Sequence, residues 1–508
     1  MTATQGALKQ FSTDHLQADL KGRSVRGGLM TLTSQGAQFI LQSVSTIVLA
    51  HLLTPADFGL VAMVTAVTGL GQAFADLGLS EATIQHPEID HDQVSKLFWV
   101  NLGIGLTLTI ITICLAPFLA WFYHEPRLKA ITFVVSVTFL IGGLRVQHDA
   151  LLRRNMRFLA LAIRDITACT IAVPLAILLA WRGAGYWAIV ALPLILNLTQ
   201  MSLSWVMAGW IPGLPKRSAE IRSLIAFGGN VAASYLTFNF TRSADSILIG
   251  WHWGAGPLGL YSRAMNLLLL PVRQLGTPAR SVAVPAFSRI QDDPERLARF
   301  YLRTANLIMW ITAPIFGFLF VVALPVIVLT LGKQWRAAGP VFQILAIFAL
   351  GQLLYESLIW LFISRGQSKR LLQLVLVMCP ITVCGYAIGL PFGIRGVALS
   401  GALTMLVTFP WVLSYSFRGT ALTLARLGKW LLCPVIASLA GVATGELAFH
   451  FISHMSAIWQ ILLVAPAFSA GCLLTAALRP VREEIKGLKE LLRNSRVMSS
   501  EQLSENLG

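Results

Sequence analysis

Residues 94–122, VSKLFWVNLGIGLTLTIITICLAPFLAWF, decide the fold class of this chain. After Lys96 the run carries no charged side chain. A helix needs about 20 apolar residues to cross the hydrocarbon of a bilayer, and this run is long enough to do so. Apolar and polar residues do not alternate along it, which disfavours a strand of a β-barrel. The run therefore predicts a membrane-spanning helix.

Similar runs recur along all 508 residues, and turn residues such as Thr54-Pro55, Gly256-Pro257 and Gly332 fall between them. The pattern predicts an all-α integral membrane protein with about 14 transmembrane helices. The expected spans are residues 29–53, 58–84, 94–122, 128–150, 158–181, 186–209, 221–250, 258–288, 304–331, 338–363, 371–391, 396–416, 430–449 and 456–478.

The composition excludes a soluble protein. Hydrophobic residues make up 56% of the chain and charged residues only 12%, whereas soluble domains carry about 25% charged residues. The net charge of +16 does not indicate nucleic-acid binding, because the charges are scattered between the apolar runs. Lys and Arg concentrate in the two tails and in the gaps that follow even-numbered spans. The positive-inside rule then places both termini in the cytoplasm.

The sequence offers no catalytic or metal-binding motif. It contains no P-loop, GxSxG, HExxH or DxD pattern, and no external gap is long enough to fold as a domain. None of the six cysteines forms a CxxC pair. His450 and His454 are expected to be histidines at the membrane interface. We therefore expect no enzyme activity, no cofactor and no metal site.

An internal repeat divides the chain. Residues 44–60 (VSTIVLAHLLTPADFGL) align without a gap on residues 244–260 (ADSILIGWHWGAGPLGL), and Gly59 falls on Gly259. Six helices separate the copies, which predicts two parallel, pseudo-symmetric six-helix lobes followed by two C-terminal helices. Transporters of this design hold their substrate between the lobes, near the middle of the membrane.

The predicted domains follow from the spans and the repeat. They are a cytoplasmic tail (1–28), an N-lobe (29–209), a cytoplasmic linker (210–220), a C-lobe (221–416), the last two spans (417–478) and a basic cytoplasmic tail (479–508). Within the last of these, the basic segment 479–496 is expected to form an amphipathic helix on lipid headgroups.

Residues 52–85, LLTPADFGLVAMVTAVTGLGQAFADLGLSEATIQ, resemble the first and second spans of bacterial Wzx-type polysaccharide flippases. This family belongs to the multidrug/oligosaccharidyl-lipid/polysaccharide exporter superfamily. The resemblance implies a flippase of the bacterial inner membrane. Such a protein moves undecaprenyl-diphosphate-linked oligosaccharide units from the cytoplasmic to the periplasmic leaflet by alternating access, for exopolysaccharide, capsule or O-antigen synthesis. It also implies membrane lipids, a polysaccharide polymerase and a chain-length regulator as neighbours.

Two other classes of function remain open at the level of sequence. A cation-coupled multidrug antiporter of the same superfamily would share the fold, but a cationic drug requires acidic groups in the cavity. A membrane polymerase or ligase often places its catalytic residues in a sizeable external loop, which this sequence lacks.

Polar residues inside two spans are candidates for a substrate cavity. They follow one face of the span at 221–250 and, under the offset of 200, one face of the first span. Bonding between packed helices is the alternative role of such residues. The candidates are Asn230, Ser234 and Thr241 in the later span, and Gln38 and Gln42 in the first span.

Four arginines are the candidates for the diphosphate site. Arg242 lies in the span at 221–250, and Arg263, Arg273 and Arg280 lie in the span at 258–288. A charge inside a membrane usually faces a bundle interior or a water-filled cavity. Guanidinium groups bind phosphate oxygens in bidentate geometry, so these residues fit an anionic headgroup.

Three acids, Asp76, Asp245 and Glu356, are candidate coupling-ion sites. Arg145 and Asp149 are spaced four residues apart, which predicts an ion pair on the gate side of the fourth span.

Arg164 and Asp165, at the start of the fifth span, are expected to anchor it at the membrane interface.

Overall fold

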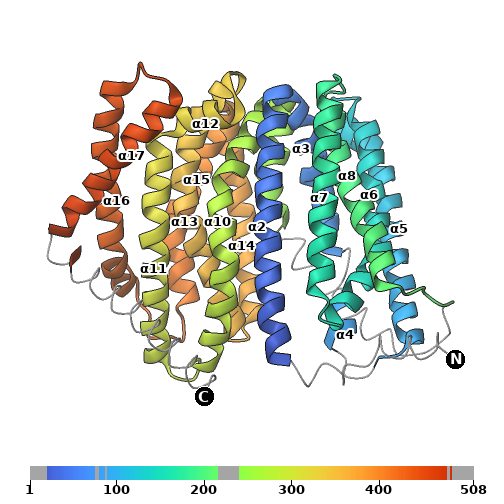
Figure 1. The fold of residues 1–508 in the computed structure, drawn as a ribbon. Coiled ribbons are helices and arrows are strands. Elements are labelled where there is room, and N and C mark those ends of the chain that lie inside the picture. The colour runs from blue at the N-terminus through green and yellow to red at the C-terminus, as the bar shows by residue number, and fades with distance from the viewer. Residues whose placement is uncertain (1–19, 75–78, 86–88, 215–238, 478–480, 483–508) are drawn as a thin grey trace. The chain divides into compact units, whose positions relative to one another are not determined.

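A computed structural model describes residues 20–74, 79–85, 89–214, 239–477 and 481–482. These residues form helices and turns, with no β-strand among them (Figure 1). The predicted all-α class is therefore confirmed. The chain divides into two compact units, residues 1–262 and 263–508. The predicted domain boundaries stay a prediction.

The first unit contains the helices up to the start of α10. They are α2 (Leu20–Leu52), α3 (Pro55–Gly71), η2 (Gln72–Phe74), α4 (Leu79–Gln85), α5 (His91–Phe122), α6 (Leu128–Arg154), α7 (Phe158–Trp181), α8 (Tyr186–Ala208), a helix over residues 239–253, and the first turns of α10 (Ala255–Arg289).

The second unit begins within α10 and contains the remaining helices. They are α11 (Pro294–Val321), α12 (Ala323–Leu331), η3 (Lys333–Ala338), α13 (Gly339–Ser364), α14 (Ser368–Gly389), η4 (Leu390–Phe392), α15 (Gly393–Ser416), α16 (Leu424–Ile452), α17 (Ala457–Leu474) and η5 (Thr475–Ala477).

Helix ends follow local capping signals in the sequence. Thr54 and Asp57 form a reciprocal capping box at the start of α3, with Pro55 in the first helical position. Asp90 and Gln93 form the same arrangement at the start of α5. These caps satisfy backbone N–H groups that have no partner within the helix.

Nine stretches of the described residues are long and apolar enough to cross a membrane, and one of them, residues 368–416, covers both α14 and α15. Helix α2 begins at Leu20 and α11 at Pro294, nine and ten residues before their expected spans. The chain is thus a multi-pass membrane protein by length and composition. The number 14 stays a prediction.

The single helix predicted over residues 58–84 is wrong. Helix α3 ends at Gly71 and is followed by the 3-10 turn η2, and α4 begins at Leu79, after residues 75–78, which lie outside the described residues. Gly69 and Gly71 lower the helix propensity of this segment. In addition, the guanidinium of Arg154 in α6 donates to the carbonyl oxygen of Thr83, at a distance of 3.1 Å. A tertiary contact thus caps the last turn of α4.

The span predicted over residues 304–331 also consists of two helices. Helix α11 ends at Val321 and α12 starts at Ala323. Pro325 has no N–H group to donate to the carbonyl oxygen of Val321, so the ladder loses one bond at this place.

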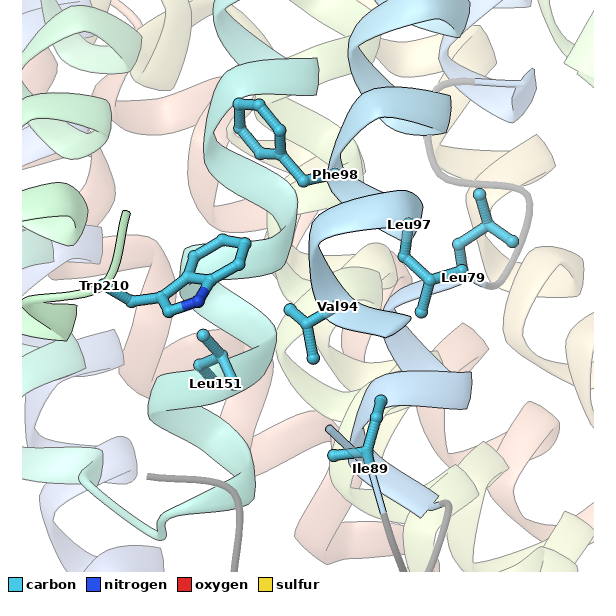
Figure 2. Close-up of a cluster of buried hydrophobic side chains, with 7 residues drawn as sticks. All are labelled: Leu79, Ile89, Val94, Leu97, Phe98, Leu151 and Trp210. Carbon is cyan, nitrogen blue, oxygen red and sulfur yellow. The ribbon is translucent and has the colours of Figure 1, made fainter. Parts of the chain in front are cut away.

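A buried apolar cluster joins α4, α5 and α6 to the segment after α8 in the first unit (Figure 2). Trp210 is the largest side chain of this cluster and is almost fully buried. The cluster contains Leu79, Ile89, Val94, Leu97, Phe98, Leu151 and Trp210.

The two copies of the repeat touch each other through their glycines. A Cβ added at Gly59 in α3 would lie 1.7 Å from the carbonyl oxygen of Ala255 in α10. A Cβ added at Gly259 would lie 1.8 Å from the carbonyl oxygen of Pro55. Because Pro55 and Ala255 are also 200 residues apart, the contact is reciprocal. Two backbones can approach this closely only where both helices carry glycine.

We predict that Gly59→Ala and Gly259→Ala will each destabilise the protein. The new methyl group must displace a backbone carbonyl, and overpacking costs about 1–3 kcal/mol or more. Thermal unfolding of the purified protein measures the effect. Gly69→Ala, in the same α3, is the control because no atom lies within 4 Å of its added Cβ. Equal stability of all three variants would contradict the close crossing.

Candidate functional site

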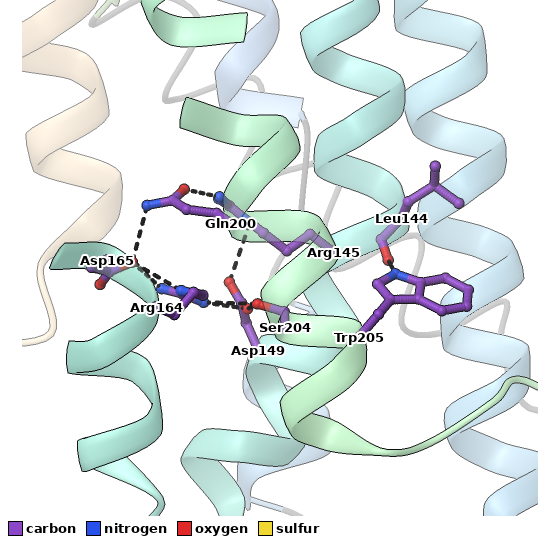
Figure 3. A network of polar contacts seen from close by, with 8 residues as sticks. All are labelled: Leu144, Arg145, Asp149, Arg164, Asp165, Gln200, Ser204 and Trp205. Carbon is purple, nitrogen blue, oxygen red and sulfur yellow. Dashed lines mark hydrogen bonds and ion pairs between the residues drawn. The ribbon is translucent and has the colours of Figure 1, made fainter. Parts of the chain in front are cut away.

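Charged and polar side chains of three helices in the first unit form a closed ring (Figure 3). Arg145 of α6 lies with its Nε 3.3 Å from Asp149 Oδ2, one turn along the same helix. Arg164 of α7 donates to Asp149 and, over 2.6 Å, to Asp165 Oδ1. Gln200 of α8 closes the ring. Its Nε2 donates to Asp165 Oδ1 over 2.9 Å, and its Oε1 accepts from Arg145.

Ser204 supports the ring from α8, one turn after Gln200. Its hydroxyl donates to Asp149 Oδ1 over 2.6 Å and accepts from Arg164 Nη1 over 3.2 Å. The side chain of Arg164 is only 6% exposed, and that of Asp149 is 14% exposed. Two arginines and two aspartates thus neutralise each other inside a helical unit, which is how buried charges are tolerated.

The ring confirms the ion pair predicted between Arg145 and Asp149, whereas its role as a gate stays a prediction. The role expected for Arg164 and Asp165, as interface anchors, stays a prediction. Arg164 points into the unit because α6 presents an acid to it, a fact that α7 alone does not reveal. The spacing of residues along one helix predicts i,i+4 pairs, but the sequence contains no comparable pattern for partners that lie on different helices.

Three of the predicted diphosphate ligands lie on α10, which runs without interruption from Ala255 to Arg289 through three prolines. Arg273 and Arg280 are exposed, and Arg263 is half-buried. Seven residues separate Arg273 from Arg280, so the two share a face of the helix to within about 20°. No acid occurs along α10. The helix therefore presents a cationic face, which we call the α10 arginine face (Arg273 and Arg280).

The carboxylate of Glu356 lies against this helix. Glu356 is in α13, and its Oε2 would lie 3.2 Å from a Cβ added at Gly276. Gly276 is three residues after Arg273 and four before Arg280. The structure thus places one of the predicted coupling-ion acids beside the arginine face, and Gly276 is a residue that sequence reasoning missed.

Asp245 is buried in the helix over residues 239–253. Its carboxylate accepts from the hydroxyl of Tyr261, over 2.9 Å, and from the backbone N–H of Ser246, over 2.5 Å. Arg242 and Thr241 lie in the same helix, and Arg242 is exposed. The binding and coupling roles of these residues stay predictions.

The polar stripe of α2 makes contacts typical of helix packing. Gln38 donates to the hydroxyl of Ser34 over 3.1 Å, and Ser34 is buried. Gln42 lies in the same helix, which packs against α7. A cavity-lining role for Gln38 and Gln42 stays a prediction.

Three predicted site residues, Asp76, Asn230 and Ser234, lie outside the described residues, as does most of the basic segment 479–496.

A cavity of about 650 Å³ lies between α3 and α5, and its lining is apolar apart from threonines. Thr68 donates its hydroxyl to the carbonyl oxygen of Val64, and Thr107 donates to that of Gly103. This cavity offers no charged side chain to a phosphate, so it does not fit the headgroup of a lipid diphosphate.

The family model described as polysaccharide biosynthesis protein matches residues 48–340, more than half of the chain. The chain belongs to this family. The resemblance carried by residues 52–85 is therefore confirmed. The α10 arginine face and the ring of α6, α7 and α8 both lie within the matched residues.

Curated relatives of this family member include the lipopolysaccharide biosynthesis protein WzxC of Escherichia coli (strain K12). It is 23% identical over 309 residues, which cover 60% of this chain and 62% of WzxC. The succinoglycan biosynthesis transport protein ExoT of Rhizobium meliloti (strain 1021) is 24% identical over 319 residues, 62% of this chain and 64% of ExoT. The chain thus matches less than two thirds of the length of these two relatives.

Solved transporters share the fold of this family member. The lipid II flippase MurJ, in an inward closed conformation, superimposes with a TM-score of 0.71 and 13% identity. The match covers 91% of this chain and all of MurJ. A multidrug resistance MATE family transporter in an inward-facing conformation gives a TM-score of 0.53 and 14% identity, over 75% of this chain and 96% of that chain.

We predict that Asp149→Ala will destabilise the protein by about 3–5 kcal/mol, because it leaves the buried Arg164 and the half-buried Arg145 without their shared acid. A fall in the thermal unfolding midpoint of purified protein measures the effect. An unchanged midpoint would show that the ring contributes nothing to stability.

The matched control is Glu125→Ala, in the loop between α5 and α6. Glu125 accepts two hydrogen bonds of 2.9 Å from Arg127, an exposed side chain, and this contact holds the pKa of Glu125 below its ordinary value. Exposed ion pairs contribute at most about 1 kcal/mol, so the control variant should unfold close to the wild-type midpoint.

Proposed function

We propose that this protein is a flippase of the bacterial inner membrane. It moves undecaprenyl-diphosphate-linked oligosaccharide units from the cytoplasmic to the periplasmic leaflet, for exopolysaccharide, capsule or O-antigen synthesis. The observation that carries the proposal is the α10 arginine face, two exposed arginines on a helix that has no acid of its own.

An arginine face inside a membrane protein fits an anionic headgroup. A diphosphate presents several oxygens, and each guanidinium can bind two of them with charge-assisted hydrogen bonds. Such a headgroup cannot cross hydrocarbon alone, because burying an unpaired charge is prohibitive. Arg273 and Arg280 would neutralise the diphosphate while the prenyl chain stays in lipid. Arg242 and Arg263 are further candidates for this role.

Membership of a polysaccharide biosynthesis family supports a glycan substrate, and a relative named as a transport protein supports transport rather than catalysis. The fold of a lipid II flippase supports movement of a lipid-linked cargo. Alternating access of two lobes would rest on the contact between the repeats at Gly59 and Gly259. By the positive-inside count, this contact lies on the periplasmic side, and both termini lie in the cytoplasm.

The energy source in this proposal is a proton, a sodium ion or the membrane potential, with Asp76, Asp245 and Glu356 as the candidate coupling residues. A polysaccharide polymerase and a chain-length regulator are the proposed neighbours of the flippase.

A multidrug antiporter is the competing function, and the same fold occurs in a MATE family transporter. The five arginines and single acid of residues 239–289 do not fit a cationic drug. Overexpression should therefore leave the resistance of a sensitive strain to cationic drugs unchanged. A rise in resistance would favour the antiporter.

We predict that Arg273→Ala will lower transport by at least about tenfold, since a hydrogen bond to a charged group is worth about 1.5–3 kcal/mol. In cells that lack the protein, the pulse-labelled lipid-linked oligosaccharide should stay inaccessible to a periplasmic glycosidase. Wild-type protein should restore access, and Arg273→Ala should not, although it accumulates as folded protein.

Arg182→Ala is the control for this experiment. Arg182 is exposed and follows the last residue of α7, away from α10 in the sequence. This variant should restore access as well as the wild type does. Full activity of Arg273→Ala would remove Arg273 from the mechanism, and normal access in cells without the protein would contradict the proposed function.

A further inference from the structure

Two side chains of helix α13 pack against α10 at Gly276. Glu356 and Leu353, one turn apart in α13, would lie 3.2 Å (Oε2) and 3.3 Å (Cδ1) from a Cβ added at Gly276. Contacts this short are tighter than ordinary van der Waals packing. A Cβ at position 276 would require the carboxylate to shift by a few tenths of an ångström, so glycine gives the Glu356 carboxylate room to lie against the surface of α10.

This contact point lies between the two members of the α10 arginine face. From Gly276, Arg273 is about 60° and Arg280 about 40° around the helix in the same direction. Along the axis they lie about 4.5 Å before it and about 6 Å after it. Residues three and four positions apart are neighbours on a helix surface, so both guanidinium groups can reach a carboxylate at Gly276.

We propose that Glu356 is an internal counter-anion for the α10 arginine face, and that the diphosphate of the cargo displaces it. Without cargo, the carboxylate at Gly276 balances the charge of Arg273 and Arg280. When the cargo enters, its phosphate oxygens bind the guanidinium groups in place of the Glu356 carboxylate. When the cargo leaves, the carboxylate returns and favours release.

The proposal rests on the proposed function and adds a positioning residue to it. It also differs from the coupling-ion role of Glu356, because displacement requires no cation at this acid. A ligand that must displace an internal competitor binds more weakly by the free energy of the contact it replaces. Removing the competitor should therefore tighten binding but slow release.

The test measures binding and transport separately. Wild type and Glu356→Gln are purified in lipid nanodiscs, and their affinity for undecaprenyl diphosphate is measured by titration. We expect Glu356→Gln to bind roughly five- to tenfold more tightly, the lower end of coupling between sites, while its transport rate in cells falls several-fold. A structural defect alone would lower both.

A second test variant, Gly276→Ala, and two controls, Glu446→Gln and Gly256→Ala, accompany Glu356→Gln. Glu446→Gln makes the same change on α16, which packs against α11 and α17, and it should bind as the wild type does. Gly276→Ala keeps the acid but requires its carboxylate to shift by a few tenths of an ångström, which weakens its contact with the arginine face, so this variant should also bind more tightly. Gly256→Ala, in the same helix with no atom within 4 Å of its added Cβ, should bind as the wild type does.

The outcomes separate the two proposals. In one outcome, the wild type binds undecaprenyl diphosphate and Arg273→Ala weakens this binding, but Glu356→Gln and Gly276→Ala bind as the wild type does. This outcome would show that the counter-anion proposal for Glu356 is wrong, while the proposed flippase function would stand. If the wild type does not bind undecaprenyl diphosphate, the proposed substrate fails and the counter-anion fails with it. Tighter binding by both variants, with slower transport, supports the counter-anion.

Discussion

The cost of charge in hydrocarbon is the constraint on which this structure depends. Inside the first unit the constraint is met by pairing, because Arg145 and Arg164 share Asp149, Arg164 also pairs with Asp165, and Gln200 closes the ring. A satisfied ring of this kind has little capacity left for an anion. Its contribution is to hold α6, α7 and α8 in one arrangement.

The α10 arginine face meets the same constraint differently. Arg273 and Arg280 remain exposed on a helix that carries no acid, and such residues in membrane proteins usually face water or a ligand. The nearby acid, Glu356, comes from another helix and lies close against α10, where residue 276 is glycine. A fixed ion pair resists exchange, whereas a carboxylate supplied by a neighbouring helix can be exchanged for a phosphate.

Glycine has a second function at the contact between the repeats. Gly59 and Gly259 let the backbones of α3 and α10 approach until carbonyl oxygens occupy the space of the missing Cβ atoms. The two contacts are related by the offset of 200 residues, so one interaction is made twice. Internal symmetry in the sequence therefore becomes a symmetric contact in space, as expected for transporters built from repeats.

The sequence by itself determined the features that depend on local or periodic patterns. Apolar runs predicted nearly every described helix, Thr54-Pro55 predicted the turn between α2 and α3, and i,i+4 spacing predicted the pair of Arg145 and Asp149. Only the tertiary structure decided which helices supply the other partners. The place of Arg164 in the ring and of Glu356 at Gly276 depends on contacts between helices far apart in the chain. Such contacts have no period, because they are set by the packing of whole helices rather than by the residues along one of them.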